Sequence, residues 1–247
     1  MIEFLADVGS WFLDNWDGKA GYLNRTWEHL QVSGAAMLVA VGVGVPLGAY
    51  FGHTGKGGLV VVSIVNIGRA LPSFGILALS LPITIEIAKV VPFIDSGLGF
   101  LPTWVALVAL ALPPIFTNTY TAVRGVDPET VEAARGMGIT EWRVLRDIEL
   151  PIASPVVLAG IRLSAVQVVA TATLGALVAY GGLGRYIIDG FSTQDDVQIF
   201  AGALLVAALS VLTEVTFATV ERRVVPRGLR LASEDEVSTP PVVAAPA

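Results

Sequence analysis

Charged side chains concentrate in one stretch of an otherwise apolar chain, residues 131–151, with the sequence VEAARGMGITEWRVLRDIELP. The whole chain of 247 residues is only 15% charged, so this density is unusual. Asp127 is placed to cap a helix that has Pro128 at its first position. On physical grounds alone the block is either a solvated connector or a surface that contacts a partner.

The spacing of helix-breaking residues predicts a hairpin of two helices in this region. The first helix should run to about Arg135, and Gly136 and Gly138 should end it. Thr140 should cap a second short helix, after which Leu150 and Pro151 turn the chain back into the membrane. We expect the hairpin to project from the membrane surface.

A second set of polar residues lies inside apolar segments. Arg69 either lies deep in the bilayer, which indicates a water-filled path or a buried partner, or reaches towards the surface. The candidates for a translocation path are Arg69, Pro72, Gln167, Thr171 and Thr173, although the polar residues near 170 could equally bond across helices.

Residues typical of catalysis or metal binding are missing from the sequence. There are no cysteines, and the two histidines, His29 and His53, are far apart in sequence. The stretch GHTGKGG lacks the upstream glycine and the Ser or Thr of a phosphate-binding loop, and no G-x-S-x-G elbow occurs. We therefore predict no catalytic residue, no metal site and no cofactor in this chain.

The composition indicates an all-α membrane protein. Hydrophobic residues make up 54% of the chain, and residues 30–51 and 96–123 contain no charge over lengths that span a bilayer. The formal charge of −6 excludes a basic nucleic-acid surface. We predict five membrane segments, which lie near residues 29–51, 57–85, 101–123, 154–180 and 197–220.

Local features refine these segments. Gly44, Gly48 and Gly52 recur on one face of the first segment and indicate close packing against another helix. The second segment should break near Pro72, and the prolines of LPPIF should disturb the third. Arg162 and Glu214 are expected either to form an ion pair between the fourth and fifth segments or to reach towards the membrane surface.

The ends of the chain are expected to lie outside the membrane. Residues 1–20 have aromatic and apolar side chains at helical spacing and predict an amphipathic helix in the membrane interface. They lack the features of a signal peptide. Residues 231–247 have no apolar periodicity and predict a disordered tail.

Counting Lys and Arg in the connections gives the orientation. With the N-terminus outside, nine lie in the inner connections and four in the outer ones. This predicts an external N-terminus, a cytoplasmic C-terminus and a cytoplasmic hairpin.

One ordered pattern in the hairpin carries a family resemblance. Glu132, Ala133 and Ala134 are followed after three residues by Gly138, and after nine more by Ile148, Leu150 and Pro151. This resembles the EAA loop of ABC importer permeases, whose pattern is EAA, three residues, Gly, nine residues, Ile-x-Leu-Pro. The resemblance extends over residues 26–223, and within it the loop covers residues 126–151.

The resemblance implies an importer subunit of the type I kind in the bacterial inner membrane. The loop would dock on separate ATPase subunits, which would hold ATP and Mg. Ala133 and Ala134 would permit close approach, while Glu132 and Arg135 would offer charge pairs. The implied partners are these ATPases, a second permease copy or a paralogue, an external substrate-binding protein and lipid.

Further stretches, including LPSFGILAL, LAGIRLSAVQ and TATLGALVAYGGLG, resemble permeases of osmoprotectant importers, which carry glycine betaine, choline and related amines. The chain departs from them at Arg69, where an uncharged polar residue is usual. The alternatives are a related importer for methionine, sulfonate or another small amine and, in a different class, a secondary transporter without an ATPase. Five segments without an internal repeat argue against the latter.

Overall fold

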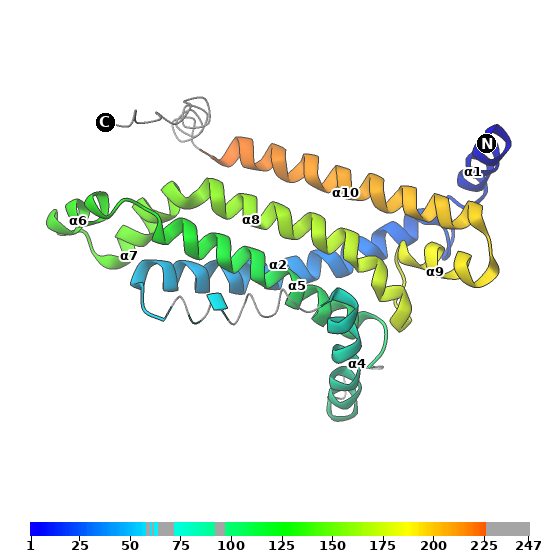
Figure 1. Ribbon diagram of the computed structural model, residues 1–247, viewed down its shortest axis with the longest axis horizontal. Helices are drawn as coiled ribbons and strands as arrows, with labels where there is room; N and C mark the ends of the chain where they lie inside the picture. The colour runs from blue at the N-terminus through cyan, green and yellow to red at the C-terminus, as the bar shows by residue number, and fades with distance from the viewer. Residues whose placement is uncertain (58–59, 61, 64–71, 92–96, 226–247) are drawn as a thin grey trace, which may run out of the picture.

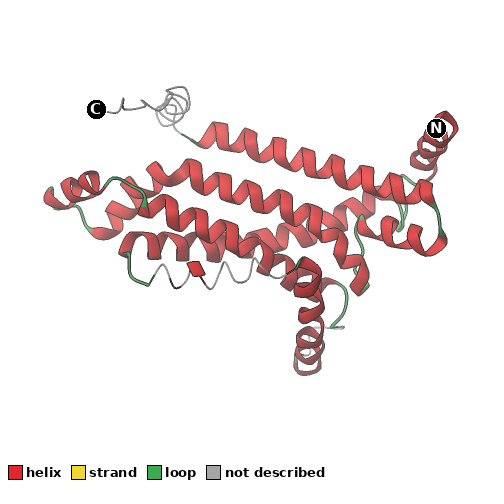
Figure 2. Cartoon of the chain, in the orientation of Figure 1, coloured by secondary structure: helices red, strands yellow, loops and turns green. Residues whose placement is uncertain are grey.

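The computed structural model describes residues 1–57, 60, 62–63, 72–91 and 97–225, and the regular structure in these ranges is helical (Figures 1 and 2). The N-terminal half holds α1 (Ile2–Asp14), α2 (Tyr22–Thr54), α4 (Ser73–Val90) and α5 (Phe100–Arg124). The hairpin holds α6 (Pro128–Gly136), α7 (Glu141–Arg143) and the π-helical segment η1 (Val144–Glu149). The chain continues in α8 (Leu150–Thr171), the 3₁₀ segment η2 (Ala172–Val178), α9 (Gly184–Thr193) and α10 (Asp196–Val224).

Five helical stretches in the described part of the chain are long and apolar enough to cross a membrane, which confirms the predicted number. They are Tyr22–Thr54, Ser73–Val90, Phe100–Arg124, Glu141–Val178 and Asp196–Val224. Pro72 is the residue immediately before α4, as expected of a break there. The paired Pro113 and Pro114 lie inside α5, which nevertheless continues as one helix to Arg124.

The centre of the bundle is formed by α2, α5 and α8. Their contact surfaces share small and β-branched residues, and the central buried cluster is Val32, Ala36, Ala40, Leu107, Ala111, Ile115, Val168 and Ala172. The glycine face of α2 packs against α5 of the same chain. A Cβ added to Gly48 would lie 2.8 Å from the carbonyl oxygen of Phe116 and 2.8 Å from Cβ of Thr119. Glycine is therefore what lets the two backbones approach.

An ion-pair cluster joins α8 to α10. Nε of Arg162 lies 3.5 Å from Glu214 Oε1, and its Nη1 lies 3.0 Å from Glu221 Oε2. The predicted Arg162–Glu214 pair is thus confirmed, and Glu221 is an additional partner. The guanidinium is thus shared between two carboxylates of α10 and ties α8 to that helix.

At the end of the bundle opposite the hairpin, the segment between η2 and α9 is fastened to the start of α2 (Figure 1). The Tyr180 hydroxyl donates to the carbonyl oxygen of Glu28 at 2.6 Å, and the Gly182 N–H donates to the carboxylate of Glu28 at 2.8 Å. Burial raises the pKa of Tyr180 to about 12, so this phenol stays a donor. The expected polar connection after residue 180 contains the short helix α9, which the sequence analysis did not predict.

Two helices stand apart from the central bundle. Figure 1 shows α4 projecting from the bundle axis, and it is held to α5 by the Ser80 hydroxyl, which donates to the carbonyl oxygen of Pro102 at 3.0 Å. At the N-terminus, Trp11 of α1 packs edge-on against Tyr186 of α9 with 5.0 Å between ring centroids. The aromatic residues of α1 therefore include one that anchors it to the protein.

Candidate functional site

The hairpin begins with the predicted helix cap. The side chain of Asp127 accepts a hydrogen bond of 3.0 Å from the N–H of Glu129, and Pro128 is the first residue of α6. The helix ends at Gly136, and the chain then reverses at Gly138, whose φ is +81°. This left-handed conformation favours glycine.

A small apolar core holds the two arms of the hairpin together. It consists of Val126, Val131, Ala134 and Val144, with Ile139 and Ile148 packed against it. Ala134 is only 2% exposed, so it packs inside the hairpin, whereas Glu132 and Ala133 on the same helix are exposed. Of the two alanines expected to permit close approach by a partner, only Ala133 faces outwards.

Arg135 is used within the hairpin rather than left free for a partner. Its Nε and Nη2 donate to the two carboxylate oxygens of Glu141, each at 2.9 Å. These hydrogen bonds raise the pKa of the Arg135 guanidinium. The two-pronged pair fixes the relative orientation of α6 and α7.

The helix that follows is continuous with the fourth membrane segment, which corrects the expected short second helix. After α7, the π-helical segment η1 leads directly into α8, with Leu150 and Pro151 in its first turn. The N–H of Leu150 donates to the carbonyl oxygen of Leu145, five residues earlier, so the helix is already continuous when it reaches Pro151. The hairpin therefore continues into a membrane helix without a turn at Leu150 and Pro151.

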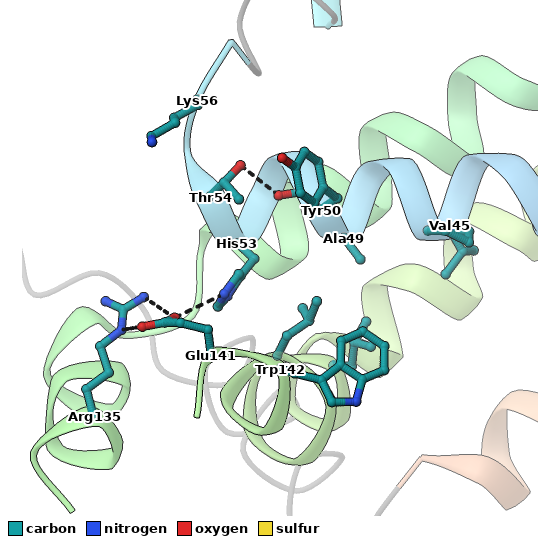
Figure 3. Close-up of a pocket in the computed structure, with 12 residues that line it drawn as sticks. Val45, Ala49, Tyr50, His53, Thr54, Lys56, Arg135, Glu141 and Trp142 are labelled. Carbon is teal, nitrogen blue, oxygen red and sulfur yellow. Dashed lines mark hydrogen bonds and ion pairs between the residues drawn. The ribbon is translucent and has the colours of Figure 1, made fainter. Parts of the chain in front are cut away.

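His53, at the end of α2, links α2 to the hairpin, a role the sequence analysis did not predict. Its Nε2 lies within ion-pair distance of Glu141 (Figure 3), and its Nδ1 lies within ion-pair distance of the buried Glu149. No local pattern could have revealed this, since His53 and Glu149 are 96 positions apart in sequence.

Two cavities border this contact. An apolar cavity of about 680 Å³ lies between α2 and the hairpin, and its lining includes Val45, Tyr50, Trp142 and Leu145. A polar cavity of about 310 Å³ lies on the other side of His53, and charged side chains from α5, α6 and η1 line it. Among the described residues, no three His, Cys, Asp or Glu side chains are grouped so as to hold a metal ion.

The described residues among those predicted to line a path have different surroundings in this chain. Arg69 lies outside the described residues. Thr171 borders a cavity of about 10 Å³ together with Ser73, the residue after the exposed Pro72. Gln167 is exposed on α8, and the Thr173 hydroxyl donates to the carbonyl oxygen of Ala170 within its own helix at 2.9 Å.

Comparison with known proteins places this helical bundle and its hairpin in a family. The family described as "binding-protein-dependent transport system inner membrane component" matches residues 44–226, which include the whole hairpin. The chain belongs to this family. It is therefore a multi-pass permease subunit of a bacterial ABC importer, in the inner membrane, and not itself an enzyme.

Two curated relatives cover almost the full length of this permease. The carnitine transport permease protein OpuCB of Listeria monocytogenes is 37% identical over 86% of this chain and 92% of the relative. The glycine betaine/carnitine/choline transport system permease protein OpuCB of Bacillus subtilis is 36% identical over 84% of this chain and 90% of the relative.

A solved structure shares the fold of the permease. A chain from inward-facing conformations of the MetNI methionine ABC transporter superposes with a TM-score of 0.73 at 23% identity, over 87% of this chain and 97% of that chain. At this identity the likeness shows the fold alone. Family membership favours the importer interpretation over a secondary transporter, because family members work with ATPase subunits and a substrate-binding protein.

Proposed function

We propose that this permease forms the translocation path of an ATP-driven importer for small quaternary-ammonium osmoprotectants such as glycine betaine, carnitine or choline. The support is chemical, because both relatives are named for the transport of substrates that carry a trimethylammonium group. Binding energy for such a cation would come mainly from aromatic faces in the substrate-binding protein. The permease would pass the released substrate across the membrane.

The hairpin would couple the permease to separate ATPase subunits, which would bind ATP and Mg. The observation that carries this proposal is that the EAA pattern falls on a hairpin braced by its own core and by the Arg135–Glu141 pair. A braced hairpin can transmit force, whereas a flexible loop cannot. Its outward face carries Glu132, Ala133 and Met137, of which Met137 is 74% exposed. We propose this face as the ATPase contact.

The path would lie between two permease copies, or between this chain and a paralogue. The cavity beside Thr171 is about 10 Å³, about the space for one water molecule and far below the size of a trimethylammonium group. The projecting helix α4 exposes apolar residues, among them Phe74, Leu79 and Ile83, which a second copy would cover. The inner surface of such a pair would include Gln167 and Thr171.

The test is transport by the reconstituted complex. The permease, its genomic ATPase partner and its binding protein are placed in proteoliposomes, and uptake of labelled glycine betaine, carnitine, choline and methionine is measured with and without ATP. We expect ATP-dependent uptake of at least one quaternary amine and none of methionine. Uptake of methionine alone would overturn the substrate, and uptake that needs no ATPase would overturn the coupling.

A further inference from the structure

His53 contacts two carboxylates of the hairpin region at once. Its Nδ1 lies 2.6 Å from Glu149 Oε2, and its Nε2 lies 3.1 Å from Glu141 Oε2. The side chains of His53 and Glu149 are 11% and 5% exposed, whereas that of Glu141 is 60% exposed. The inner contact is therefore shielded from water, and the outer contact is open to it.

Both contacts of His53 can be hydrogen bonds only when His53 and Glu149 together hold two protons. An ionised carboxylate only accepts hydrogen bonds, so an imidazole that faces two of them must carry hydrogens on both nitrogens. Alternatively, a neutral Glu149 carboxyl donates to Nδ1 while Nε2–H donates to Glu141. Both arrangements hold the same number of protons. Loss of one of these protons would leave a neutral imidazole with a single N–H, which can donate to only one of the two carboxylates, so one of the two contacts would open.

Together with Arg135, these residues form a continuous chain of contacts that we call the clasp: Arg135, Glu141, His53 and Glu149. Arg135 of α6 holds Glu141 of α7, Glu141 contacts His53 of α2, and His53 contacts Glu149 at the end of η1. Each member belongs to a different element. The clasp therefore connects the proposed ATPase contact to α2, from which it is distant in sequence.

Within the described ranges, few other contacts near the clasp join α2 to the hairpin. Between α2 and the hairpin lies the apolar cavity of about 680 Å³, so side chains from the two sides do not fill the space between them (Figure 3). Apolar packing near the clasp includes Ala49 and Leu145, which share a cluster with Val123. The six residues of η1, at the end of the hairpin, have π-helical geometry, a form that is rare and often found at functional sites.

We propose that His53 is a positioning residue that transmits movement of the hairpin to α2, and that it does so only while both of its ring nitrogens are hydrogen-bonded to the two carboxylates. The inference rests on the proposed coupling role of the hairpin. The hairpin is covalently continuous with α8, which therefore moves with it. The further inference is that α2 moves with the hairpin as well. It also makes coupling sensitive to the pH on the hairpin side.

Other charged groups near His53 come from every element around it. Arg124 of α5, and Glu132 and Arg135 of α6, line the polar cavity with His53 and Glu149. Lys56 follows α2 and lines the apolar cavity, with its side chain directed away from the clasp (Figure 3). The pH profile of the native protein therefore reflects these groups as well as His53. The role of His53 is judged by comparing variants with the native protein.

The experiment measures substrate molecules imported per ATP hydrolysed in the reconstituted complex, from about pH 6 to about pH 9 on the ATP side. We expect the native ratio to fall at least threefold as pH rises. His53→Gln should show a low ratio at every pH and no such fall, because the amide has one donor nitrogen in place of the two ring nitrogens that face the two carboxylates. Glu149→Gln should keep a high ratio with little pH dependence, because its amide can donate to Nδ1 while Nε2–H donates to Glu141. Glu141→Gln should lower the ratio less than His53→Gln does, and the control Lys56→Gln should follow the native profile.

A cross-link separates loss of the clasp from misfolding. Because the chain has no cysteine, His53→Cys with Glu141→Cys introduces the only thiols. A short bifunctional thiol reagent that bridges them should restore a high, pH-independent ratio. An unchanged ratio and pH profile in His53→Gln, or no recovery after verified cross-linking, would overturn the role of His53. Absence of ATP-dependent uptake by the native complex would instead overturn the proposed function.

Discussion

At the scale of single residues, Gly138 is the position where the hairpin depends on one backbone conformation. Its φ of +81° is unfavourable for residues with a Cβ, yet a Cβ built there would meet nothing within 4 Å. Substitution at this position therefore changes backbone strain without crowding the neighbours. Asparagine tolerates the left-handed region far better than a β-branched residue does.

This difference gives a matched pair of variants. Gly138→Val should strain the turn by about 1–2 kcal/mol, shift α6 relative to α7 and lower ATP-driven uptake several-fold. Gly138→Asn should stay close to the native rate. The measurement is uptake and ATP hydrolysis by the reconstituted complex, with membrane insertion checked for both variants. Equal activity of the two variants would mean that the turn conformation does not matter for coupling.

At the scale of elements, the contact between α2 and α5 shows why small residues recur at a spacing of four. Gly44, Gly48 and Gly52 all lie on the α5 side of α2, and added Cβ atoms would approach α5 to about 2.9, 2.8 and 2.9 Å respectively. Gly42 lies on the same helix, where an added Cβ would meet nothing within 4 Å. Substitutions at Gly48 and at Gly42 therefore distinguish the effect of helix packing from the effect of helix propensity.

We expect Gly48→Leu to force the two helices apart and to lower the free energy of unfolding by about 1–3 kcal/mol. Gly42→Leu removes a glycine from the same helix without a clash and should leave stability unchanged or slightly higher. Thermal unfolding in detergent, followed by circular dichroism, makes the comparison. Similar midpoints for both variants would show that the α2–α5 contact can relax around a larger side chain.

At the scale of the whole molecule, the fold gathers the predicted inner connections at one end. The hairpin lies at the end of the bundle where the last helix, α10, finishes, and α1 and α9 lie at the opposite end (Figure 1). This arrangement agrees with the excess of Lys and Arg in the predicted inner connections. The clasp would then face the compartment that holds ATP.

Orientation can be tested with single cysteines because the native chain has none. Gly9→Cys in α1 and Met137→Cys at the hairpin both replace exposed residues. We expect a membrane-impermeant maleimide to label position 9 from the external face of the membrane, and position 137 only after permeabilisation. The opposite labelling pattern would invert the predicted orientation and place the hairpin outside.

Much of the architecture follows from local sequence. Long uncharged runs, the Asp127–Pro128 cap and the spacing of glycines identify the membrane helices and the hairpin, since each depends on residues within a few turns of one another. The EAA pattern identified the importer family for the same reason. Continuity of the helix through Leu150 and Pro151 was not predicted, because a proline within a helical pattern usually ends or kinks the helix.

Contacts between distant segments required the tertiary structure. Only the fold shows that Gly48 packs on α5, that Ala134 faces the hairpin core, and that Arg135 is already paired with Glu141. The contact between His53 and Glu149 is the clearest case, since it joins residues 96 positions apart through the packing of α2, α5 and α8. Local sequence thus determined which elements form and which family they belong to. Packing decided which polar groups meet, because that depends on helix rotation and separation, which no single segment specifies.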